Sequence, residues 1–331
     1  MVPAASHSPP STADPARLDA ALTTLELTVR RRLDGLLQGN HLGLVPGPGT
    51  EPGDARPYNA GDDVRRMDWS VTARTTEPHI RQTVADRELE TWLVADLSAS
   101  LDFGTTGCEK RDLVVAAAAA VGHLTRGGGN RIGAVVATGA GVKRIPARGG
   151  RPYLQHLLRE LASTPRSGPG ERGDLSVALE QLRRPPRRRG LAVVISDFIG
   201  PAGGDGALSW ERPLRALSGR HDLLAIEVLD PRDIELPAVG LVTLLDPETG
   251  RTKEVSTTPE LRAAFGKAAA AHRDQVALAL RRAGAAHLVL RTDRDWVADV
   301  MRFVMSRKRG WTGAAAGSPG SPNAPRAGEA W

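Results

Sequence analysis

Short apolar runs separated by segments of helical periodicity constrain the fold of this chain more than any other feature of its sequence. The clearest runs, residues 91–95 (Thr-Trp-Leu-Val-Ala) and 191–196 (Leu-Ala-Val-Val-Ile-Ser), predict strands buried on both faces, as in the interior of a parallel sheet. Helix-like segments such as 110–126 and 175–183 lie between the runs. Strands that alternate with helices in this way predict an α/β fold with a doubly wound, mostly parallel sheet.

The rest of the chain divides into a small N-terminal part, the main domain and two tails. Between residues 16 and 38, leucine and valine recur at helical spacing and predict an amphipathic helix. Residues 241–245 and 252–256 are expected to pair as a hairpin. The expected divisions are a disordered tail over 1–16, an N-terminal helix and β subdomain over 17–87, the main domain over 88–309 and a second disordered tail over 310–331.

The composition predicts a cytoplasmic protein without a membrane span. Cys108 is the only cysteine, so no intramolecular disulfide can form and a reducing compartment is favoured. The N-terminal stretch lacks the apolar core of a signal peptide. The longest apolar stretch, 113–121, is far shorter than the ~20 residues of a transmembrane helix.

Positive charge is in excess, with a net charge of +6 and arginines clustered at 30–32 and over 183–189. A basic surface can bind nucleic acid. However, no nucleic-acid-binding motif accompanies these clusters, and aromatic residues, which would stack on bases, make up only 4% of the chain. A solvated, arginine-rich surface is therefore favoured, and a basic nucleic-acid-binding protein remains the third hypothesis.

The residues that follow the first apolar run combine one carboxylate with two hydroxyl groups. Asp96, Ser98 and Ser100 alternate along the chain, so their side chains are expected to project to the same side. Hard oxygen ligands of this kind suit Mg²⁺ or Mn²⁺. The second run ends at Asp197, and two carboxylates at neighbouring strand ends would repel each other unless a cation lay between them. The alternative is that these residues only cap the structures that follow them.

Several classes of enzyme are excluded because the sequence lacks their catalytic motifs. Aspartyl-phosphate phosphatases use Asp-x-Asp-x-Thr, whereas Ser98 stands in place of the second acid here. The chain has no Gly-x-x-x-x-Gly-Lys-Ser/Thr phosphate loop, no Gly-x-Ser-x-Gly elbow and no His-Glu-x-x-His. We therefore expect a protein that is not an enzyme, with a Mg²⁺-dependent hydrolase that uses the same carboxylates as the alternative.

A longer motif precedes the first apolar run. Its residues are Arg56, Tyr58, Gly61, Asp62, Arg65, Asp68, Trp69 and Arg74. Gly61 allows a tight turn, the charged residues can pair, and Trp69 is expected to serve as a large apolar anchor. The motif is thus interpreted as a structural clamp that holds the N-terminal subdomain to the sheet, with a partner-binding surface as the alternative.

Together with Asp96-x-Ser98-x-Ser100 and the following Phe103-Gly104, this motif resembles the bacterial domain of unknown function 58, over about residues 40–230. The resemblance implies a core of von Willebrand factor A type and a metal-ion-dependent adhesion site. It also implies association with a MoxR-type AAA+ ATPase, because members of the family commonly accompany such ATPases.

By the same resemblance, the ligands of a Mg²⁺ or Mn²⁺ ion are Asp96, Ser98, Ser100 and Asp197. Members of the family have a threonine where this chain has Gly173. Metal binding is therefore expected to be weak, and Gly173→Thr to strengthen it. The neighbouring Asp174 could turn inward as a substitute ligand or serve as the N-cap of the helix over 175–183.

These observations predict a non-enzymatic, metal-dependent protein-interaction module that works as an adaptor or co-chaperone. The ion would keep one coordination position open for an acidic side chain of the MoxR-type ATPase or of its client protein. We expect neither nucleic acid nor a membrane to be a partner.

Overall fold

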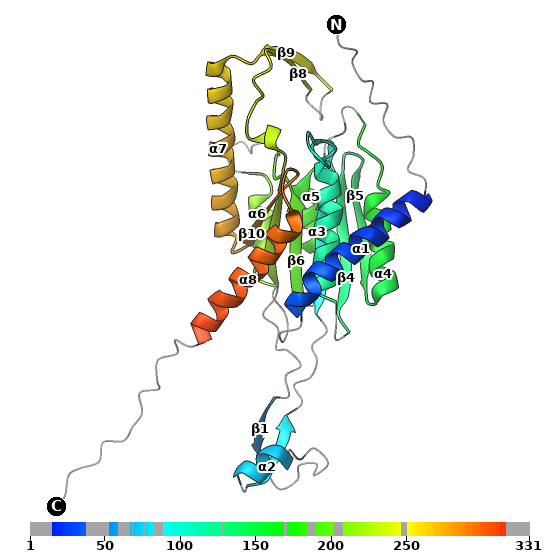
Figure 1. Ribbon diagram of the computed structural model, residues 1–331, viewed down its shortest axis with the longest axis vertical. Helices are drawn as coiled ribbons and strands as arrows, with labels where there is room; N and C mark the ends of the chain where they lie inside the picture. The colour runs from blue at the N-terminus through cyan, green and yellow to red at the C-terminus, as the bar shows by residue number, and fades with distance from the viewer. Residues whose placement is uncertain are drawn as a thin grey trace, which may run out of the picture.

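A six-stranded sheet forms the centre of the protein in the computed structural model (Figure 1). The structure describes residues 15–37, 53–58, 67, 69–75, 77–82, 89–126, 129–168, 171, 173–183, 190–200, 208–245 and 250–315. The strand order is β10-β7-β6-β3-β4-β5. The strands are β3 (Glu90–Asp96), β4 (Arg131–Thr138), β5 (Gly141–Arg148), β6 (Gly190–Ser196), β7 (His221–Leu229) and β10 (Ala286–Arg291). All neighbours are parallel except β4 and the edge strand β5, so the predicted fold class is confirmed.

The two apolar runs in the sequence form the middle of this sheet. Strand β3 lies between β4 and β6, and Val94 is in register with Val135 on one side and with Val194 on the other. Every residue of β3 and β6 is buried. Continuous apolar sequence is needed here because helices cover both faces of the sheet.

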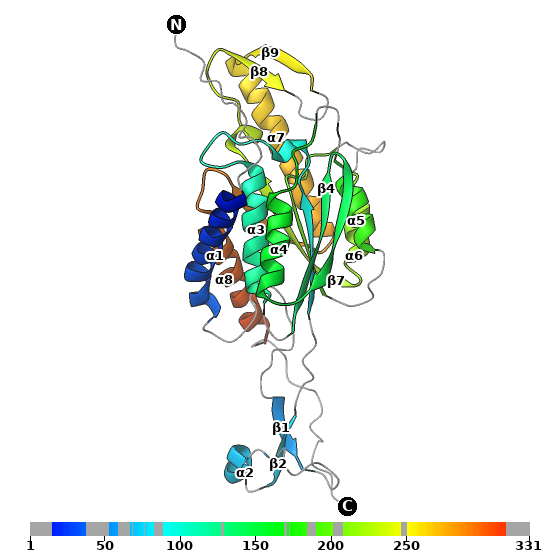
Figure 2. The same cartoon turned by 90° about the vertical axis from the view of Figure 1, so that its right-hand side faces the viewer.

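Helices α1 (Pro15–Leu37), α3 (Lys110–Leu124), α4 (Arg151–Ala162) and α8 (Trp296–Ala315) cover one face, as Figure 2 shows. Helices α5 (Leu175–Arg183), α6 (Glu211–Leu217) and α7 (Pro259–Arg282) cover the other. At the middle of α3, five consecutive alanines over 116–120 are all buried. Side chains this small allow the helix backbone to lie close to the sheet.

The N-terminal helix α1 belongs to the main domain. Val29 and Leu33 are buried in the same core as α3 and α4, and Arg32 forms two hydrogen bonds with Asp295, at 3.0 and 2.7 Å. The expected subdomain over 17–87 is therefore divided, because its helix packs on the sheet domain. At the other end of the chain, α8 continues to Ala315, beyond the expected start of a tail at residue 310.

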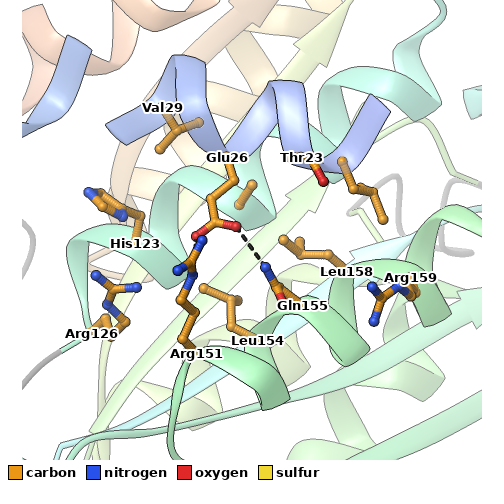
Figure 3. A pocket seen from close by; sticks show the side chains of 12 residues that line it. Thr23, Glu26, Val29, His123, Arg126, Arg151, Leu154, Gln155, Leu158 and Arg159 are labelled. Atoms are coloured by element: carbon orange, nitrogen blue, oxygen red, sulfur yellow. Dashed lines mark hydrogen bonds and ion pairs between the residues drawn. The ribbon is translucent and has the colours of Figure 1, made fainter. Parts of the chain in front are cut away.

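Glu26 of α1 joins this helix to α4. Its carboxylate accepts hydrogen bonds from Arg151 Nε at 2.7 Å and Gln155 Nε2 at 2.8 Å. These side chains line a small pocket of about 30 Å³ (Figure 3). The pocket is a gap between α1, α3 and α4.

The family motif lies on a small unit made of β1 (Gly53–Pro57), α2 (Trp69–Thr75) and β2 (His79–Gln82). Arg56 pairs with Ile80 across the antiparallel strands, and the Tyr58 amide donates to Pro78 O at 2.8 Å. Arg74 Nε donates to Ser70 O within α2, whereas Gly61, Asp62, Arg65 and Asp68 lie outside the described residues. The Trp69 side chain is 71% exposed, which contradicts its expected role as a buried anchor.

A hairpin extends from the end of the sheet at which the parallel strands finish (Figure 1). It consists of β8 (Leu241–Leu245) and β9 (Thr252–Ser256), so the predicted pairing is confirmed. The short helix η3 (Pro231–Asp233) leads from β7 toward it, and Thr257 N donates to Gly240 O at its base, at 2.6 Å. Among the helices that the structure describes, none is long and apolar enough to cross a membrane.

Candidate functional site

Asp96 and Asp197 lie at the carboxyl ends of the adjacent parallel strands β3 and β6, as the sequence predicted. Ala95 is in register with Ile195, so both strands finish at the same level of the sheet. Ser196 Oγ donates to Asp96 Oδ2 at 2.7 Å and links the two strand ends. Both carboxylates are buried, with Asp197 only 1% exposed. The two acids thus lie together at the end of the sheet where open α/β sheets bind their ligands, and we refer to the site that they form with Ser98 and Ser100 as the crevice.

The loop after β3 brings two hydroxyl groups to the same place. Asp96 Oδ1 accepts a hydrogen bond from Ser98 N at 3.0 Å, which turns the chain over the strand end. The short helix η2 (Ala99–Leu101) follows, and Ser98 Oγ lies 3.3 Å from Ser100 Oγ. The structure therefore gathers the carboxylate and the two hydroxyls that the alternating sequence predicted.

The loop after β6 is held by a strained residue. Phe198 follows Asp197 with φ of 55°, an uncommon value for a residue other than glycine. Its buried ring packs on Trp210, with 5.0 Å between ring centroids, and its amide donates to Ser196 Oγ at 2.9 Å. This packing fixes the turn that carries Asp197 and the exposed Ile199.

Negative charge is poorly compensated at Asp96. Burial, and then the charge of Asp197, raise the pKa of Asp96 to about 6, although hydrogen bonds from Ser196 and Ser98 oppose the shift. The ionised form of Asp96 is therefore disfavoured in the folded protein.

Gly173 lies against the Asp96–Ser100 loop. A Cβ atom at position 173 would lie 2.4 Å from Ser98 Cβ, far inside van der Waals contact. The structure therefore contradicts the expectation that Gly173→Thr would simply add a hydroxyl ligand. Only glycine lets this backbone approach Ser98 so closely.

Asp174 adopts the second of its two expected roles. Its side chain is exposed, and Oδ1 accepts hydrogen bonds from Ser176 N at 2.8 Å and Ser176 Oγ at 2.6 Å. These bonds cap the N-terminus of α5. The carboxylate is thus engaged with its own helix.

The structure adds a buried lysine that sequence reasoning missed. Lys110, the first residue of α3, is 1% exposed, and its Nζ donates to Asp197 Oδ2 at 2.9 Å. Nζ also contacts Asp233, at 3.2 Å from Oδ2 and 3.3 Å from Oδ1. Burial alone would lower the pKa of Lys110, but the two carboxylates raise it above its usual value. The signal in the sequence was a lysine at the start of a helix whose middle, residues 113–121, is entirely apolar.

A chain of hydrogen bonds continues from Lys110 to the ends of two further strands and to the loop after η2. Asp233 Oδ2 accepts from Asp230 N at 2.8 Å. The fully buried Asp230 carboxylate accepts from Thr105 N and Oγ1 and from Thr292 Oγ1, at 2.6–2.8 Å. Burial opposes ionisation of Asp230, but these hydrogen bonds lower its pKa below the usual value. The network joins the loop after η2 to the ends of β7 and β10.

The donor set fits a hard divalent cation. Asp197 and Asp233 share the single ammonium group of Lys110, and Asp96 lies close enough to Asp197 to be affected by its charge, so negative charge is in excess when the three acids are ionised. Each carboxylate has about four lone-pair sites, and the hydrogen bonds from Ser98 and Ser196 to Asp96, and from Lys110 and Ile199 to Asp197, occupy only part of them within the described part of the chain. Over the described residues, no group of three His, Cys, Asp or Glu side chains is arranged to hold a metal. A cation here would depend on two carboxylates, two serine hydroxyls and water.

Two solved structures resemble this chain distantly. BatB from Bacteroides thetaiotaomicron is 14% identical, with a TM-score of 0.41 over 67% of this chain and 99% of its own. A von Willebrand factor type A protein from Catenulispora acidiphila is 12% identical, with a TM-score of 0.36 over 69% of this chain and 43% of its own. Likenesses at this level carry no inference about function.

Sequence relatives are much closer. Uncharacterized proteins from Mycobacterium bovis and Mycobacterium tuberculosis are 62% identical over 297 residues, which is 90% of this chain and 92% of each relative. The sequence model of the family described as "Protein of unknown function DUF58" matches residues 54–275. The match covers more than half of the chain and confirms the resemblance seen in the motifs. The chain therefore belongs to the DUF58 family.

Proposed function

We propose that the protein is a non-enzymatic, metal-dependent protein-interaction module whose binding site is the crevice at the ends of β3 and β6. The observation that carries the proposal is the convergence of the buried Asp96, Ser98 and Asp197 with the half-buried Ser100, with negative charge in excess. When bound, Mg²⁺ or Mn²⁺ would neutralise the acids and offer an open position to an acidic side chain of a partner. The side chains of the crevice supply the oxygen ligands and keep them in place.

Exposed apolar side chains beside the crevice support a role in protein binding. Phe103, in the loop after η2, is 40% exposed, and Ile199, two residues after Asp197, is 47% exposed. The hairpin at the same end of the sheet also exposes Leu241 and Leu245. A polar centre with apolar side chains around it is typical of a surface that binds another protein.

The partner in this proposal is a MoxR-type AAA+ ATPase or the client that such an ATPase remodels. The family resemblance supports this choice, and the crevice supports a partner that presents Asp or Glu. We place the complex in the cytoplasm, where ATP is available to the ATPase.

The proposal predicts that association with the purified MoxR-type ATPase of the same organism needs the divalent ion. EDTA, Asp96→Ala and Asp197→Ala should each weaken binding at least about tenfold, because each removes part of a desolvated charge contact. Biolayer interferometry in Mg²⁺ or EDTA measures the effect. Glu180→Gln, an exposed carboxylate paired with Arg183, is the matched control and should bind as the wild type does.

Three outcomes would contradict this assignment. Binding that survives EDTA and both alanine variants, but is lost when the arginines over 183–189 are neutralised, would show an electrostatic contact elsewhere on the surface. Asp96-dependent turnover of a phosphoester panel in Mg²⁺ would instead indicate the hydrolase. Retention on DNA that falls steeply with salt would indicate the nucleic-acid-binding alternative.

A further prediction concerns the apolar rim of the crevice. Phe103→Ser should weaken the ATPase complex by about tenfold while the melting temperature stays nearly constant, because an exposed aromatic contributes to binding more than to folding. Leu278→Ser is the control, since Leu278 is similarly exposed, at 42%, but lies near the C-terminal end of α7. Equal effects of the two variants would show that the rim of the crevice is not the contact surface.

A further inference from the structure

Lys110 is placed where a lysine is unfavourable unless it has a specific role. It is the first residue of α3, and the positive end of a helix dipole disfavours a cation. Its side chain is also removed from water, which disfavours the charged form. Replacing a buried ion pair by apolar residues is often neutral or stabilising, so stability alone does not account for this lysine.

Several contacts fix the ammonium group of Lys110 between two carboxylates. Asp197 holds it from the end of β6, and Asp233 holds it from η3. The Lys110 backbone amide donates to Phe103 O at 2.8 Å, and Nζ lies 5.8 Å from the centroid of the Phe103 ring. These contacts therefore hold the positive charge of Lys110 beside Asp197, which is one of the candidate metal ligands.

The charge is shared unequally between the two acids of the crevice. Lys110 is hydrogen-bonded to Asp197, whereas the hydrogen bonds to Asp96 come from uncharged groups, the Ser98 amide and the Ser196 hydroxyl. The lysine thus compensates one candidate ligand and leaves the other without a counter-charge.

We propose that Lys110 is a resident cation of the crevice, a positioning residue that neutralises Asp197 and thereby lowers the affinity of the crevice for a divalent ion. The inference rests on the proposed metal-dependent function and adds how the metal affinity is set. Lys110 keeps the crevice folded in the absence of the ion, so that the ion can bind and leave without unfolding the loops. Because the same ammonium group holds Asp233, the crevice is also tied to the segment that leads into the hairpin.

The test compares two substitutions that change the charge beside Asp197 in opposite directions. Lys110→Met removes the positive charge and keeps the side-chain length, so the dissociation constant for Mn²⁺ should fall at least about tenfold. Asp233→Asn removes the acid that shares the ammonium group, so Lys110 should compensate Asp197 more fully and Mn²⁺ should bind several-fold more weakly. Isothermal titration calorimetry with Mn²⁺ gives both constants. Lys143→Met, which removes an exposed lysine paired with Glu160, should bind Mn²⁺ as the wild type does.

Thermal unfolding in EDTA separates this role from a purely structural one. Lys110→Met should melt at a lower temperature than the wild type without the ion, although it binds the ion more tightly. A structural ion pair alone predicts that stability and Mn²⁺ affinity fall together, and that result overturns the inference. If Lys110→Met fails to fold, Lys110→Gln decides, because it removes the charge and keeps a hydrogen-bond donor: tighter Mn²⁺ binding than in the wild type supports the inference, and unchanged or weaker binding overturns it.

The outcomes also distinguish this inference from the proposed function. Mn²⁺ binding by the wild type that is unchanged in Lys110→Met overturns the role of Lys110 and leaves the metal-dependent module standing. Binding by Lys110→Met but not by the wild type supports the role of Lys110 and overturns metal dependence of the natural protein. No binding by either protein overturns both.

Discussion

Asp96→Asn is expected to raise the free energy of unfolding of the metal-free protein by roughly 1–3 kcal/mol at pH 7.5, and to abolish stabilisation by Mg²⁺ or Mn²⁺. Burial and the charge of Asp197 raise the pKa of Asp96 from 3.8 to about 6, so the ionised carboxylate disfavours the folded state. Asparagine removes the charge and retains an acceptor for the Ser98 amide. Asp96, a proposed metal ligand, would thus reduce the stability of the folded protein when the ion is absent.

The stability of the wild-type protein relative to Asp96→Asn is expected to depend on pH. Because the pKa of Asp96 is higher in the folded state than in the unfolded state, protonation of Asp96 stabilises the folded protein. This stabilisation is fully present below pH 3.8 and is lost as the pH rises through about 6. The difference in stability between Asp96→Asn and the wild type should therefore shrink when the pH is lowered from 7.5 to 5. Urea unfolding in EDTA at both pH values measures it, with the exposed Asp222→Asn as control. A variant less stable than the wild type at pH 7.5 would show that the charge of Asp96 is compensated.

Gly173→Thr is expected to destabilise the protein by about 1–3 kcal/mol and to weaken metal binding, the reverse of what the family motif suggests. Its Cβ would lie 2.4 Å from Ser98 Cβ, so either the loop over 98–100 or the start of α5 must move. Movement of this loop displaces Ser98 and Ser100, which are two of the four candidate ligands.

Gly173→Ala separates the effect of the Cβ atom from that of the hydroxyl group. It should show nearly the same loss of stability as Gly173→Thr in urea unfolding and the same weakening of Mn²⁺ binding in calorimetry. Gly219→Ala is the control, because nothing lies within 4 Å of a Cβ at that position. Tighter Mn²⁺ binding by Gly173→Thr than by both the alanine variant and the wild type would mean that the backbone adapts and the threonine ligand is restored.

Much of the sheet and half of the site could be predicted because they depend on local sequence. The run over 91–95 lies within β3 (Glu90–Asp96), and the helix expected over 175–183 is α5. Asp96 and Asp197 could be placed together because residues that follow adjacent parallel strands meet at one edge of the sheet. Periodicity and chain direction were sufficient for these predictions.

The remaining features depend on contacts between segments far apart in the chain. Lys110 lies 87 positions from Asp197 and 123 from Asp233, and nothing in the local sequence indicates which carboxylates a lysine at a helix start will contact. The approach of Gly173 to Ser98 is likewise a property of packing. Helix α1 was assigned to the wrong unit because periodicity predicts a buried face but not the surface that it packs against.

The buried alanines over 116–120 have a consequence for the chemistry of the crevice. They determine how deeply α3 sits on the sheet, and the position of this helix in turn sets how far the ammonium group at its first residue reaches toward Asp197. A larger side chain in this stretch, as in Ala117→Val, would lift the helix and lengthen that contact without touching the crevice. Under the proposed metal dependence, the affinity for the ion is thus set in part by the thickness of a hydrophobic layer that contains none of the ligands.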